Sequence, residues 1–407
     1  MSSTPLRIGF VGTGFVAAFH LRALLNVRHV ELIGVHSRDA KRREAFAQEV
    51  DRCELGPCRA HPTLSSLLED ARLDAVWILV PNDQRLEVMR EIHAAVLAKR
   101  SAVRAVACEK PLGRTLPEAL EMLRLATDAG LLHGYLENEV FMPAAQRGRE
   151  IVWRRAVPIA GRPYLARAAE EHSGPHAAWF WRGDRQGGGV MSDMMCHAIE
   201  VGRHLLTAPG EPRSSLTVRS VTGQVNYLKW TRPQYVRDLN ERFGIDFRAK
   251  KVEDFARATV VLTDVDDTEL IVEASTSWAY VGPGLRLDLS LLGPEYAMEF
   301  NSLNSGLRVF LSRRIQGGSG EDLVEKQNAE QGLMPVIEDE AGSYGYTSED
   351  RHMVDAFRAG RLPNETFDDG VEVIRMIMGL YKSAELGCTV TFPDADLMHY
   401  VPPSVRS

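Results

Sequence analysis

A glycine-rich turn between an apolar run and an amphipathic stretch constrains the fold of this chain most strongly. The turn reads Val11-Gly12-Thr13-Gly14-Phe15-Val16-Ala17, which is G-x-G-x-x-A. The first glycine of such a turn permits a tight bend, the second lets a ligand approach the backbone, and the alanine lets helix and strand pack closely. The free N–H groups at the start of the following helix favour an anion. We therefore expect this turn to bind the pyrophosphate of a dinucleotide through Gly12, Gly14, Phe15 and Val16.

The turn opens a repeating pattern of short apolar runs and amphipathic stretches. Nearly continuous apolar runs are typical of parallel strands that are covered on both faces. They lie at Leu6–Val11, Val30–Val35, Leu73–Val80, Val103–Cys108 and Leu131–Leu136, and the helical stretches at Phe15–Val27, Ala40–Val50, Gln84–Ala98 and Leu116–Ala129. Strand and helix in alternation predict a doubly wound α/β domain with right-handed crossovers over residues 1–141.

After about Phe141 the pattern changes, and strand-like runs follow one another without helices between them. These runs lie at Arg257–Thr263, Glu269–Ser277, Leu285–Leu292, Tyr296–Phe300 and Leu307–Leu311. The short turns between them predict an antiparallel or mixed sheet in a second domain, residues 142–407. Two helices, Ser348–Ala359 and Asp368–Leu386, close the chain, and the stretches Gly317–Gly345 and Thr231–Glu253 are expected to be loops.

The composition excludes several classes of protein. The chain has 48 basic and 55 acidic residues, a net charge of −7, which argues against nucleic acid as the main partner. No apolar run approaches the roughly 18 residues that a membrane span needs. The five cysteines are scattered and odd in number, and no signal peptide precedes the first strand. We expect a protein of the reducing cytoplasm.

The residues that follow the second predicted strand bear on which dinucleotide binds. NAD sites usually place an acidic residue here to hold the ribose 2′-hydroxyl, but this chain has His36-Ser37-Arg38-Asp39. Arg38 can pair with a 2′-phosphate, which favours NADP, or stack on the adenine, which allows NAD. Asp39 can instead cap the next helix. Ser37 and Arg38 are candidate cofactor contacts, and the choice between NAD and NADP stays open.

A lysine follows the fourth predicted strand, in the segment Cys108-Glu109-Lys110-Pro111. In an open parallel sheet, ligands bind beyond the carboxyl ends of the strands. An ammonium group at that place can hydrogen-bond a substrate hydroxyl and favour its deprotonation, which aids the loss of hydride from carbon. The structural alternative is an ion pair between Glu109 and Lys110 at the surface.

A second cluster of candidate residues follows three glycines, in the segment Gly187–His197. Asp193 and His197 stand four positions apart and are expected to share one face of a helix, where a carboxylate and an imidazole form an acid/base pair. Metal binding by this pair is the sharper alternative, but the sequence shows no third ligand, so we predict no metal. A helix cap with a buried structural histidine is the plainer alternative.

Together these motifs resemble the glucose–fructose oxidoreductase, inositol dehydrogenase and rhizopine catabolism family, written Gfo/Idh/MocA. The order and spacing of the motifs agree over roughly the first half of the chain. The matching elements are the glycine turn with His20, Pro81-Asn82, Glu109-Lys110-Pro111 and Gly187–His197. The resemblance implies an α/β protein with an N-terminal Rossmann domain and a C-terminal α/β domain that carries a large open, mostly antiparallel sheet. It also implies NAD or NADP as cofactor and a homodimer or homotetramer.

The resemblance also implies roles for individual residues. Lys110 matches the catalytic lysine of the family, Asp193 its substrate-contacting aspartate, and His197 its usual acid/base. The expected cofactor contacts include Pro81, Asn82, Glu109, Lys110 and Pro111, and Asn138 matches an asparagine often seen after the fifth strand. The chain departs from the pattern at two places: Arg85 stands where the family often has histidine, and Glu200 where it commonly has aspartate.

Aromatic and basic residues mark the expected substrate side. Aromatic faces suit the C–H face of a sugar, and arginine suits hydroxyl or anionic groups. The expected substrate contacts are Lys110, Asn138, His172, Trp179, Arg182, Asp193 and His197, with Glu170, Glu171 and Trp181 as further candidates. The alternative places both tryptophans in the core. A basic, aromatic cluster, Lys229-Trp230-Thr231-Arg232, suggests an anionic sugar if it reaches the pocket.

The function that follows is an NAD(P)-dependent oxidoreductase that acts on a hydroxyl of a sugar, sugar derivative or polyol. His197 takes the hydroxyl proton, Lys110 stabilises the developing alkoxide, and Asp193 orients the substrate or tunes His197. The alternative is an NAD-dependent glycoside hydrolase that uses transient oxidation at C3, elimination, water addition and re-reduction. A nucleotide sensor or scaffold is a third reading, against which the joint presence of the three residues speaks.

Overall fold

The computed structural model describes residues 4–312, 324–327 and 331–406, and the chain divides into two compact units. Unit 1 comprises Met1–Met142 and Tyr344–Ile374, and unit 2 comprises Pro143–Ser343 and Arg375–Ser407. The first break lies beside the predicted boundary at residue 141. The sequence-based division differs from unit 1 in one respect, because it assigned residues 344–374 to the second domain.

Unit 1 carries a parallel sheet of the predicted doubly wound type. Its strands run in the order β3-β2-β1-β4-β5-β6, and every neighbouring pair is parallel. They are β1 (Leu6–Val11), β2 (Val30–His36), β3 (Arg59–His61), β4 (Ala75–Ile78), β5 (Ala105–Glu109) and β6 (Leu132–Leu136). The order is that of the Rossmann fold. The short β3, which has no apolar run of its own, was not predicted.

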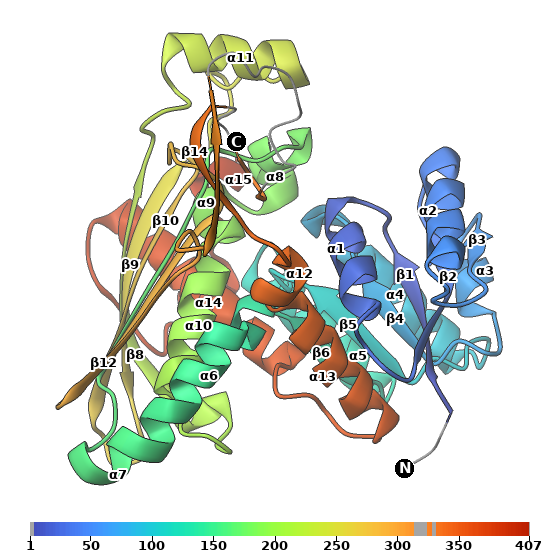
Figure 1. Ribbon diagram of the computed structural model, residues 1–407, viewed down its shortest axis with the longest axis horizontal. Helices are drawn as coiled ribbons and strands as arrows, with labels where there is room; N and C mark the ends of the chain where they lie inside the picture. The colour runs from blue at the N-terminus through green and yellow to red at the C-terminus, as the bar shows by residue number, and fades with distance from the viewer. Residues whose placement is uncertain (1–3, 313–323, 328–330, 407) are drawn as a thin grey trace. The chain divides into compact units, whose positions relative to one another are not determined.

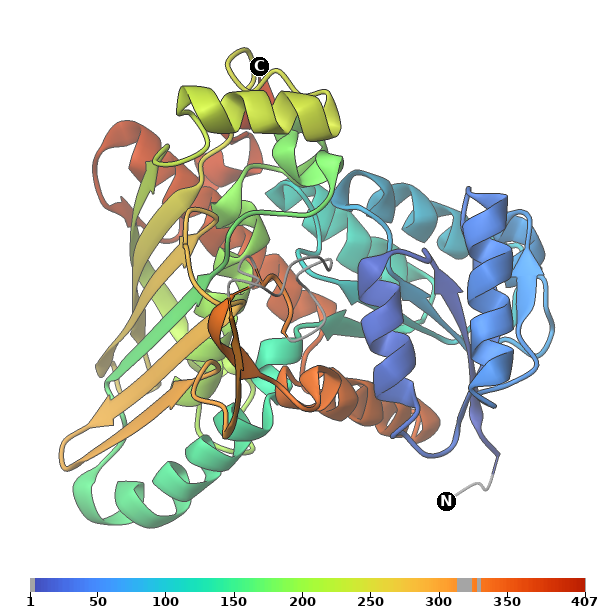
Figure 2. The ribbon, with the colours of Figure 1, turned by 45° about the horizontal axis from the view of Figure 1, so that its top comes forward.

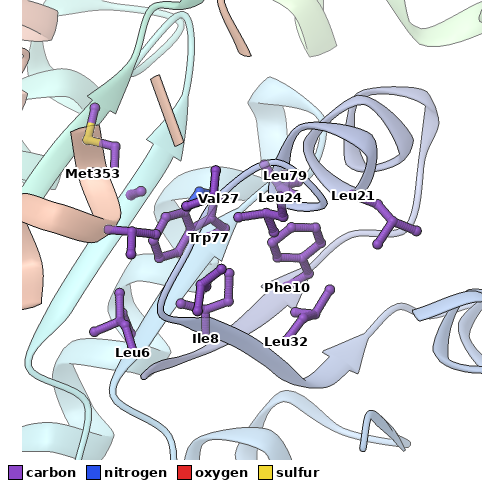
Figure 3. Packing of buried hydrophobic residues seen from close by; sticks show 14 of the residues in the cluster. Leu6, Ile8, Phe10, Leu21, Leu24, Val27, Leu32, Trp77, Leu79 and Met353 are labelled. Carbon is purple, nitrogen blue, oxygen red and sulfur yellow. The ribbon is translucent and has the colours of Figure 1, made fainter. Parts of the chain in front are cut away.

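The helices of unit 1 lie between the strands, as the alternation predicted. They are α1 (Phe15–Leu24), α2 (Ala40–Arg52), α3 (Leu64–Leu68), α4 (Asn82–Leu97), α5 (Leu116–Asp128), the 3₁₀ turn η1 (Asn138–Phe141) and α13 (Tyr346–Arg358), and α14 (Phe367–Leu386) begins here and ends in unit 2. Helix α13 packs against α1 (Figure 1). Its Met353 and Phe357 belong to the core around Trp77, as Figure 3 shows for Met353. Periodicity predicted α13 but not the sheet that it covers.

Unit 2 is built on a larger sheet, and the sheet is mostly antiparallel as expected (Figure 2). Its order is β12-β11-β7-β10-β9-β8-β15, in which β7 and β10 run parallel and the other neighbouring pairs antiparallel. The strands are β7 (Leu165–Glu171), β8 (Thr217–Asn226), β9 (Phe255–Thr263), β10 (Glu269–Ser277), β11 (Arg286–Gly293), β12 (Tyr296–Asn301) and β15 (Val390–Thr391). Burial alternates along β7, β9, β10 and β11, so one face of these strands is covered.

Helix α10 (Met195–Leu206), which is buried throughout, packs on β7 and β10 of this sheet. The other helices and turns of unit 2 are α6 (Pro143–Ile151), η2 (Val152–Ala156), α7 (Val157–Ala160), η3 (Ala178–Trp181), α8 (Gly183–Gln186), α9 (Val190–Asp193), η4 (Arg213–Ser215), α11 (Pro233–Phe243), α12 (Glu340–Ser343), η5 (Ala395–Met398) and α15 (Pro403–Arg406).

Two predicted loops contain regular structure. The stretch Thr231–Glu253 holds α11, whose buried Val236 and Leu239 were overlooked among its many polar residues, so the loop prediction was wrong there. The stretch Gly317–Gly345 contains β14 (Gly332–Val336), which pairs with β13 (Leu307–Leu311), and α12. Residues 317–323 and 328–330 of that prediction lie outside the described residues.

Among the residues that the structure describes, no helix has the length and apolar character that crossing a membrane requires.

Candidate active site

The glycine turn has the geometry that a dinucleotide needs. Gly12 has a φ of +112°, and a Cβ there would overlap the carbonyl oxygen of Leu79, so only glycine fits. A Cβ on Gly14, which begins α1, would meet nothing within 4 Å, so the space above this helix start is open. The buried hydroxyl of Thr13 has no hydrogen-bond partner among the described residues. These features fit the pyrophosphate of NAD or NADP.

The end of β2 supports the helix-cap alternative for Asp39. Its Oδ1 accepts a hydrogen bond of 3.0 Å from the N–H of Arg42, so Asp39 caps α2. Arg38 is exposed and remains a candidate for a 2′-phosphate or for adenine. Sequence reasoning missed Arg43, whose Nη1 donates to the carbonyl oxygen of Ser37 at 2.7 Å. Arg43 is buried, and its Nε has no hydrogen-bond partner among the described residues.

Glu109 is not part of a surface ion pair. Its side chain is 6% exposed, and its Oε1 lies 3.1 Å from Nε2 of His20. Its Oε2 accepts a hydrogen bond of 3.0 Å from the backbone N–H of Lys110. Burial opposes ionisation, but the hydrogen bond and charge of His20 hold the pKa of Glu109 below its ordinary value. Glu109 therefore anchors the backbone of Lys110, where the sequence predicted a contact to the cofactor.

Arg85, the first departure from the family pattern, links two of the predicted cofactor segments. It is buried near the start of α4, which begins after Pro81 with Asn82 as its first residue. Its Nε donates to the carbonyl oxygen of Val80 at 3.2 Å, and its Nη1 donates to that of Pro111. The guanidinium thus ties the loop after β4 to the loop after β5, a task that suits its fork of donors.

A buried carboxyl that the sequence analysis missed acts on Lys110 electrostatically. Burial raises the pKa of Glu137 to about 8, with the charge of Lys110 opposing the shift and that of Glu109 adding to it. Glu137 follows β6, the neighbour of β5, so the rule that ligands bind at the carboxyl ends of strands was the signal that would have found it. The amide of the next residue, Asn138, donates to the carbonyl oxygen of Tyr344 at 2.8 Å. This residue stays a predicted substrate contact.

In unit 2, the helix expected to carry both Asp193 and His197 is broken between them. Helix α9 ends at Asp193, and α10 begins at Met195, so the prediction of one helix face was wrong. Oδ2 of Asp193 accepts a hydrogen bond of 3.3 Å from the indole N–H of Trp278. His197 is buried, and one of its ring nitrogens lies within 4.8 Å of a carboxylate oxygen of Glu170. The imidazole thus lies near the carboxyl group of a strand residue.

Two of the three glycines before α9 are required because Tyr381 and Glu253 occupy the space that a side chain would need. Gly188 has a φ of +150°, and a Cβ there would overlap the hydroxyl of Tyr381. A Cβ on Gly189 would overlap the carbonyl oxygen of Glu253. Oε1 of Glu253 accepts from the N–H groups of Gly189 at 2.8 Å and Met191 at 3.2 Å, and the Tyr381 hydroxyl donates to the same oxygen. These contacts hold the segment that carries Asp193.

Replacing Gly188 with alanine is expected to lower the free energy of unfolding by about 2–4 kcal/mol, because the methyl group meets the Tyr381 hydroxyl and the φ disfavours any side chain. The matched control is Gly210→Ala, whose φ is +90° with nothing within 4 Å of the added Cβ. The control is expected to cost only about 1 kcal/mol. Urea unfolding of both variants measures the difference, and equal losses would contradict the packing argument.

Glu170 lies on the covered side of β7, whereas Glu171 faces the other way and pairs with Arg286 at 2.6 Å, and the buried His172 follows the end of the strand. Nδ1 of His172 accepts a hydrogen bond of 2.9 Å from the backbone N–H of Gly174. Because a backbone N–H only donates, Nδ1 carries no proton, and the neutral ring has its proton on Nε2. His172 can therefore donate one hydrogen bond from Nε2, which suits the predicted contact with a substrate hydroxyl.

The tryptophans divide between core and surface. Trp181 is buried against Trp230 and Trp278, with ring centroids 4.7 and 5.2 Å away, so its core alternative is confirmed. Trp179 is partly exposed and stacks on Phe180 at 3.8 Å, and it stays a predicted substrate contact. Because Trp278 hydrogen-bonds Asp193, the aromatic cluster supports a candidate catalytic residue.

The predicted basic residues are engaged locally. Arg182 is exposed and pairs with Asp184 at 3.0 Å. Arg232 is exposed and donates to the carbonyl oxygen of Leu228 at 3.1 Å. The ammonium of Lys229 lies over the ring of Trp230, 4.7 Å from its centroid. These contacts give the anionic-sugar hypothesis no support from geometry, and it stays a prediction.

Sequence reasoning missed a second imidazole near Asp193. The ammonium of Lys326 donates to Nδ1 of His176. Burial and the charge of Lys326 lower the pKa of His176 to about 4, against the opposing charge of Asp193. The ring is therefore neutral at physiological pH. No motif joins these residues, which are separated by 150 positions in the chain.

The second departure from the family pattern, Glu200, has a structural explanation. It is fully buried in α10 and pairs with Arg203 at 2.5 Å and with Arg213 at 3.1 Å. Both arginines are buried as well. Glu200 therefore belongs to a buried ion-pair cluster within unit 2. Its role is structural, since removing one partner would leave an uncompensated buried charge.

Two family models match the chain. The model described as "Oxidoreductase family, NAD-binding Rossmann fold" matches residues 6–135, and the model of the GFO/IDH/MocA C-terminal domain matches residues 159–293. The two matches fall on the two sheets and include most of the residues discussed above.

Curated relatives and solved structures agree with these matches. A 1,5-anhydro-D-fructose reductase of Ensifer adhaerens is 28% identical over 53% of this chain and 61% of that protein. A D-glucoside 3-dehydrogenase of Escherichia coli is 26% identical over 51% of this chain and 56% of that protein. The chain thus matches little more than half of the length of these relatives. The fold is similar to that of GenD2 from gentamicin A biosynthesis, solved with NAD, at a TM-score of 0.77 and 24% identity over 97% of this chain and 98% of that one.

Proposed function

We propose, because this chain belongs to the GFO/IDH/MocA oxidoreductase family, that it oxidises or reduces a hydroxyl-bearing carbon of a sugar, sugar derivative or polyol. The observation that carries the proposal is the buried His197 ring close to the carboxyl group of Glu170, after a segment that Glu253 and Tyr381 hold in place. A buried imidazole with a carboxylate partner is the common form of a general base for a hydroxyl proton. The printed names of the relatives, a sugar reductase and a glucoside dehydrogenase, support the substrate class.

In this proposal the residues of the chain bind, orient and move the proton. His197 accepts the proton of the substrate hydroxyl, and Glu170 stabilises the imidazolium that results. Lys110 donates to the developing alkoxide and stabilises its charge. Asp193, oriented by Trp278, accepts a hydrogen bond from a neighbouring hydroxyl. The nicotinamide cofactor, when bound, supplies the acceptor or donor of hydride.

The two units divide this work in the proposal. Unit 1 is an NAD-binding Rossmann fold of the family, and the turn at Gly12 and Gly14 holds the pyrophosphate. Unit 2 supplies the substrate contacts and the proton acceptor. If the cofactor is NADP, the guanidinium groups of Arg38 and Arg43, which follow β2, pair with its 2′-phosphate.

The experiment that tests the proposal starts from the purified full chain. Denaturing the protein and identifying any released nucleotide by mass and stoichiometry shows whether NAD or NADP is retained. A panel of free sugars, sugar acids, inositols and glycosides is then screened for formation of reduced nucleotide, with both nucleotides supplied. Turnover of a member of the panel supports the proposal. Binding of nucleotide without turnover of any polyol or glycoside would speak for the sensor reading.

A second candidate, an NAD-dependent glycoside hydrolase, is favoured by one observation. Its cycle of oxidation at C3, elimination, water addition and re-reduction needs a second base for the C2 hydrogen, and Glu170 beside His197 offers one. This candidate predicts one tightly retained nucleotide per chain and release of the aglycone from an aryl glycoside without net reduction of added nucleotide. Accumulation of reduced nucleotide with an intact glycoside would exclude it.

A further inference from the structure

A chain of buried contacts in unit 1 runs from the late helix α13 to the backbone of Lys110. Asp350, on α13, places its Oδ2 2.9 Å from Nδ1 of His20, on α1. The other nitrogen of the ring, Nε2, lies 3.1 Å from Oε1 of Glu109, at the end of β5. The second oxygen of Glu109 accepts from the N–H of Lys110 at 3.0 Å. Four residues from three separate parts of the sequence thus meet in one line of contacts.

The contacts of His20 favour the protonated form of its ring. Both ring nitrogens of His20 face carboxylate oxygens, and an ionised carboxylate accepts hydrogen bonds but donates none. With both carboxylates ionised, each nitrogen donates a hydrogen bond and carries a proton, which makes the ring an imidazolium. The remaining oxygen of Asp350, Oδ1, accepts from the indole N–H of Trp77 at 3.0 Å. Asp350 is therefore held on both of its oxygens.

We propose that Asp350 is a positioning residue of the active site: through His20 it orients Glu109, and Glu109 in turn fixes the backbone from which the Lys110 side chain projects. The inference rests on the proposed function only for the role of Lys110. The line of contacts itself belongs to the fold of unit 1. It also gives a reason why residues 344–374 pack in this unit: α13 supplies the carboxylate that the histidine of α1 needs.

His20 lies among aromatic rings, and the two carboxylates beside it are what stabilises a charge on its ring. The ring is fully buried and meets the rings of Phe10 and Tyr346 edge-on. Burial works against its charge, but Asp350 and then Glu109 raise the pKa of His20 well above its ordinary value. The other ionisable groups that act on this network are Glu349, Glu137, Arg85 and Lys110.

The neighbouring carboxyl on the same helix serves as a matched control. Glu349 is fully buried, and neither of its carboxyl oxygens has a hydrogen-bond partner among the described residues. Burial raises its pKa well above the ordinary value, which favours the neutral form of the carboxyl. Glu349→Gln replaces this carboxyl by an uncharged group of the same shape, next to Asp350, without cutting the line from Asp350 to Lys110.

The test compares Asp350→Asn with Glu349→Gln in the full chain. Since asparagine leaves one ring nitrogen of His20 without a carboxylate, we expect kcat to fall by about 10- to 100-fold, with the KM for substrate changed far less, because a misplaced catalytic group costs this much. Glu349→Gln is expected to stay within about twofold of the parent. Combining Asp350→Asn with His20→Gln is expected to cost no more than the larger single change, because both break one line.

A measurement that needs no substrate keeps this inference separate from the proposed function. Nitrogen-15 NMR of protein labelled at histidine and lysine, with the His20 ring assigned through His20→Gln and the Lys110 amide through Lys110→Met, reads the protonation of the ring and the position of the amide. We expect two protonated ring nitrogens at neutral pH in the parent and in Glu349→Gln, and a moved Lys110 backbone amide signal in Asp350→Asn alone. A neutral His20 ring in the parent, or an unmoved Lys110 amide in folded Asp350→Asn, would overturn the proposal even if no substrate is found. If Asp350→Asn does not fold, the parent spectrum alone decides.

Discussion

Lys110→Met is expected to lower kcat by about 10²–10⁴-fold while the protein keeps its fold and its nucleotide. The reason is that the ammonium stabilises the charge that develops on the substrate oxygen, which methionine, of similar length, does not do. The backbone of residue 110 is held by Glu109 through its N–H, and this bond does not depend on the side chain. The nucleotide is expected to lose only a small part of its affinity, because Lys110 is one of several predicted cofactor contacts and the pyrophosphate turn lies elsewhere in unit 1.

Two further variants sharpen this expectation. Lys110→Arg keeps the charge but spreads it over a planar fork, so it is expected to recover only part of the lost rate. Lys251→Met removes an exposed lysine of unit 2 and is expected to leave kcat unchanged. Steady-state kinetics on the substrate found in the screen gives kcat, and quenching of protein fluorescence gives the nucleotide affinity. A loss below about tenfold in Lys110→Met would remove this residue from the acid/base machinery.

His197→Asn is expected to lower kcat/KM by about 10²–10⁴-fold, because the variant removes the buried imidazole that is proposed to accept the hydroxyl proton, close to the carboxyl group of Glu170. The His197 ring is buried in α10, so its replacement by the smaller, polar asparagine also raises the question whether the protein keeps its stability. Thermal unfolding of the variant answers that second question.

The control variants separate chemistry from structure. His399→Asn replaces an exposed histidine of unit 2 and is expected to behave as the parent. Glu170→Gln keeps the shape of the strand residue but removes its charge, and we expect a smaller loss than in His197→Asn because the base itself remains. A loss in kcat/KM below about tenfold in His197→Asn, with the fold intact, would show that another group accepts the proton.

The sequence predicted best those parts of the site that depend on local chain geometry. The glycine turn, the position of Lys110 after β5 and the capping of α2 by Asp39 each follow from a few neighbouring residues, and the strands around them were found because apolar runs are local patterns as well. Long-range contacts were beyond this reasoning. Helix α13 was predicted with nearly correct bounds, yet nothing in its periodicity tells that Asp350 meets a histidine 330 positions earlier.

The segment before His197 shows the same limit at shorter range. The spacing of Asp193 and His197 predicted that they share one helix face, but the helix is interrupted at Met194. Gly189, in the segment before this interruption, contacts Glu253 and Tyr381, which lie 64 or more positions away in the sequence. Trp181 appeared equally suited to a sugar and to the core, because only the packing of Trp230 and Trp278 decides between the two. Glu170, noted in the sequence, gained its meaning only through its distance to His197.

The most direct test of the central claim, that hydride moves between a carbohydrate carbon and the nicotinamide, follows deuterium. Sugars, inositols and glycosides that carry deuterium on every carbon are incubated with the full chain and oxidised nucleotide, and the mass of the nucleotide is measured. We predict reduced nucleotide that carries one added deuterium with the parent protein, and none with Lys110→Met or His197→Asn. A parent protein that binds the nucleotide but transfers no deuterium from any member of the panel would contradict the account.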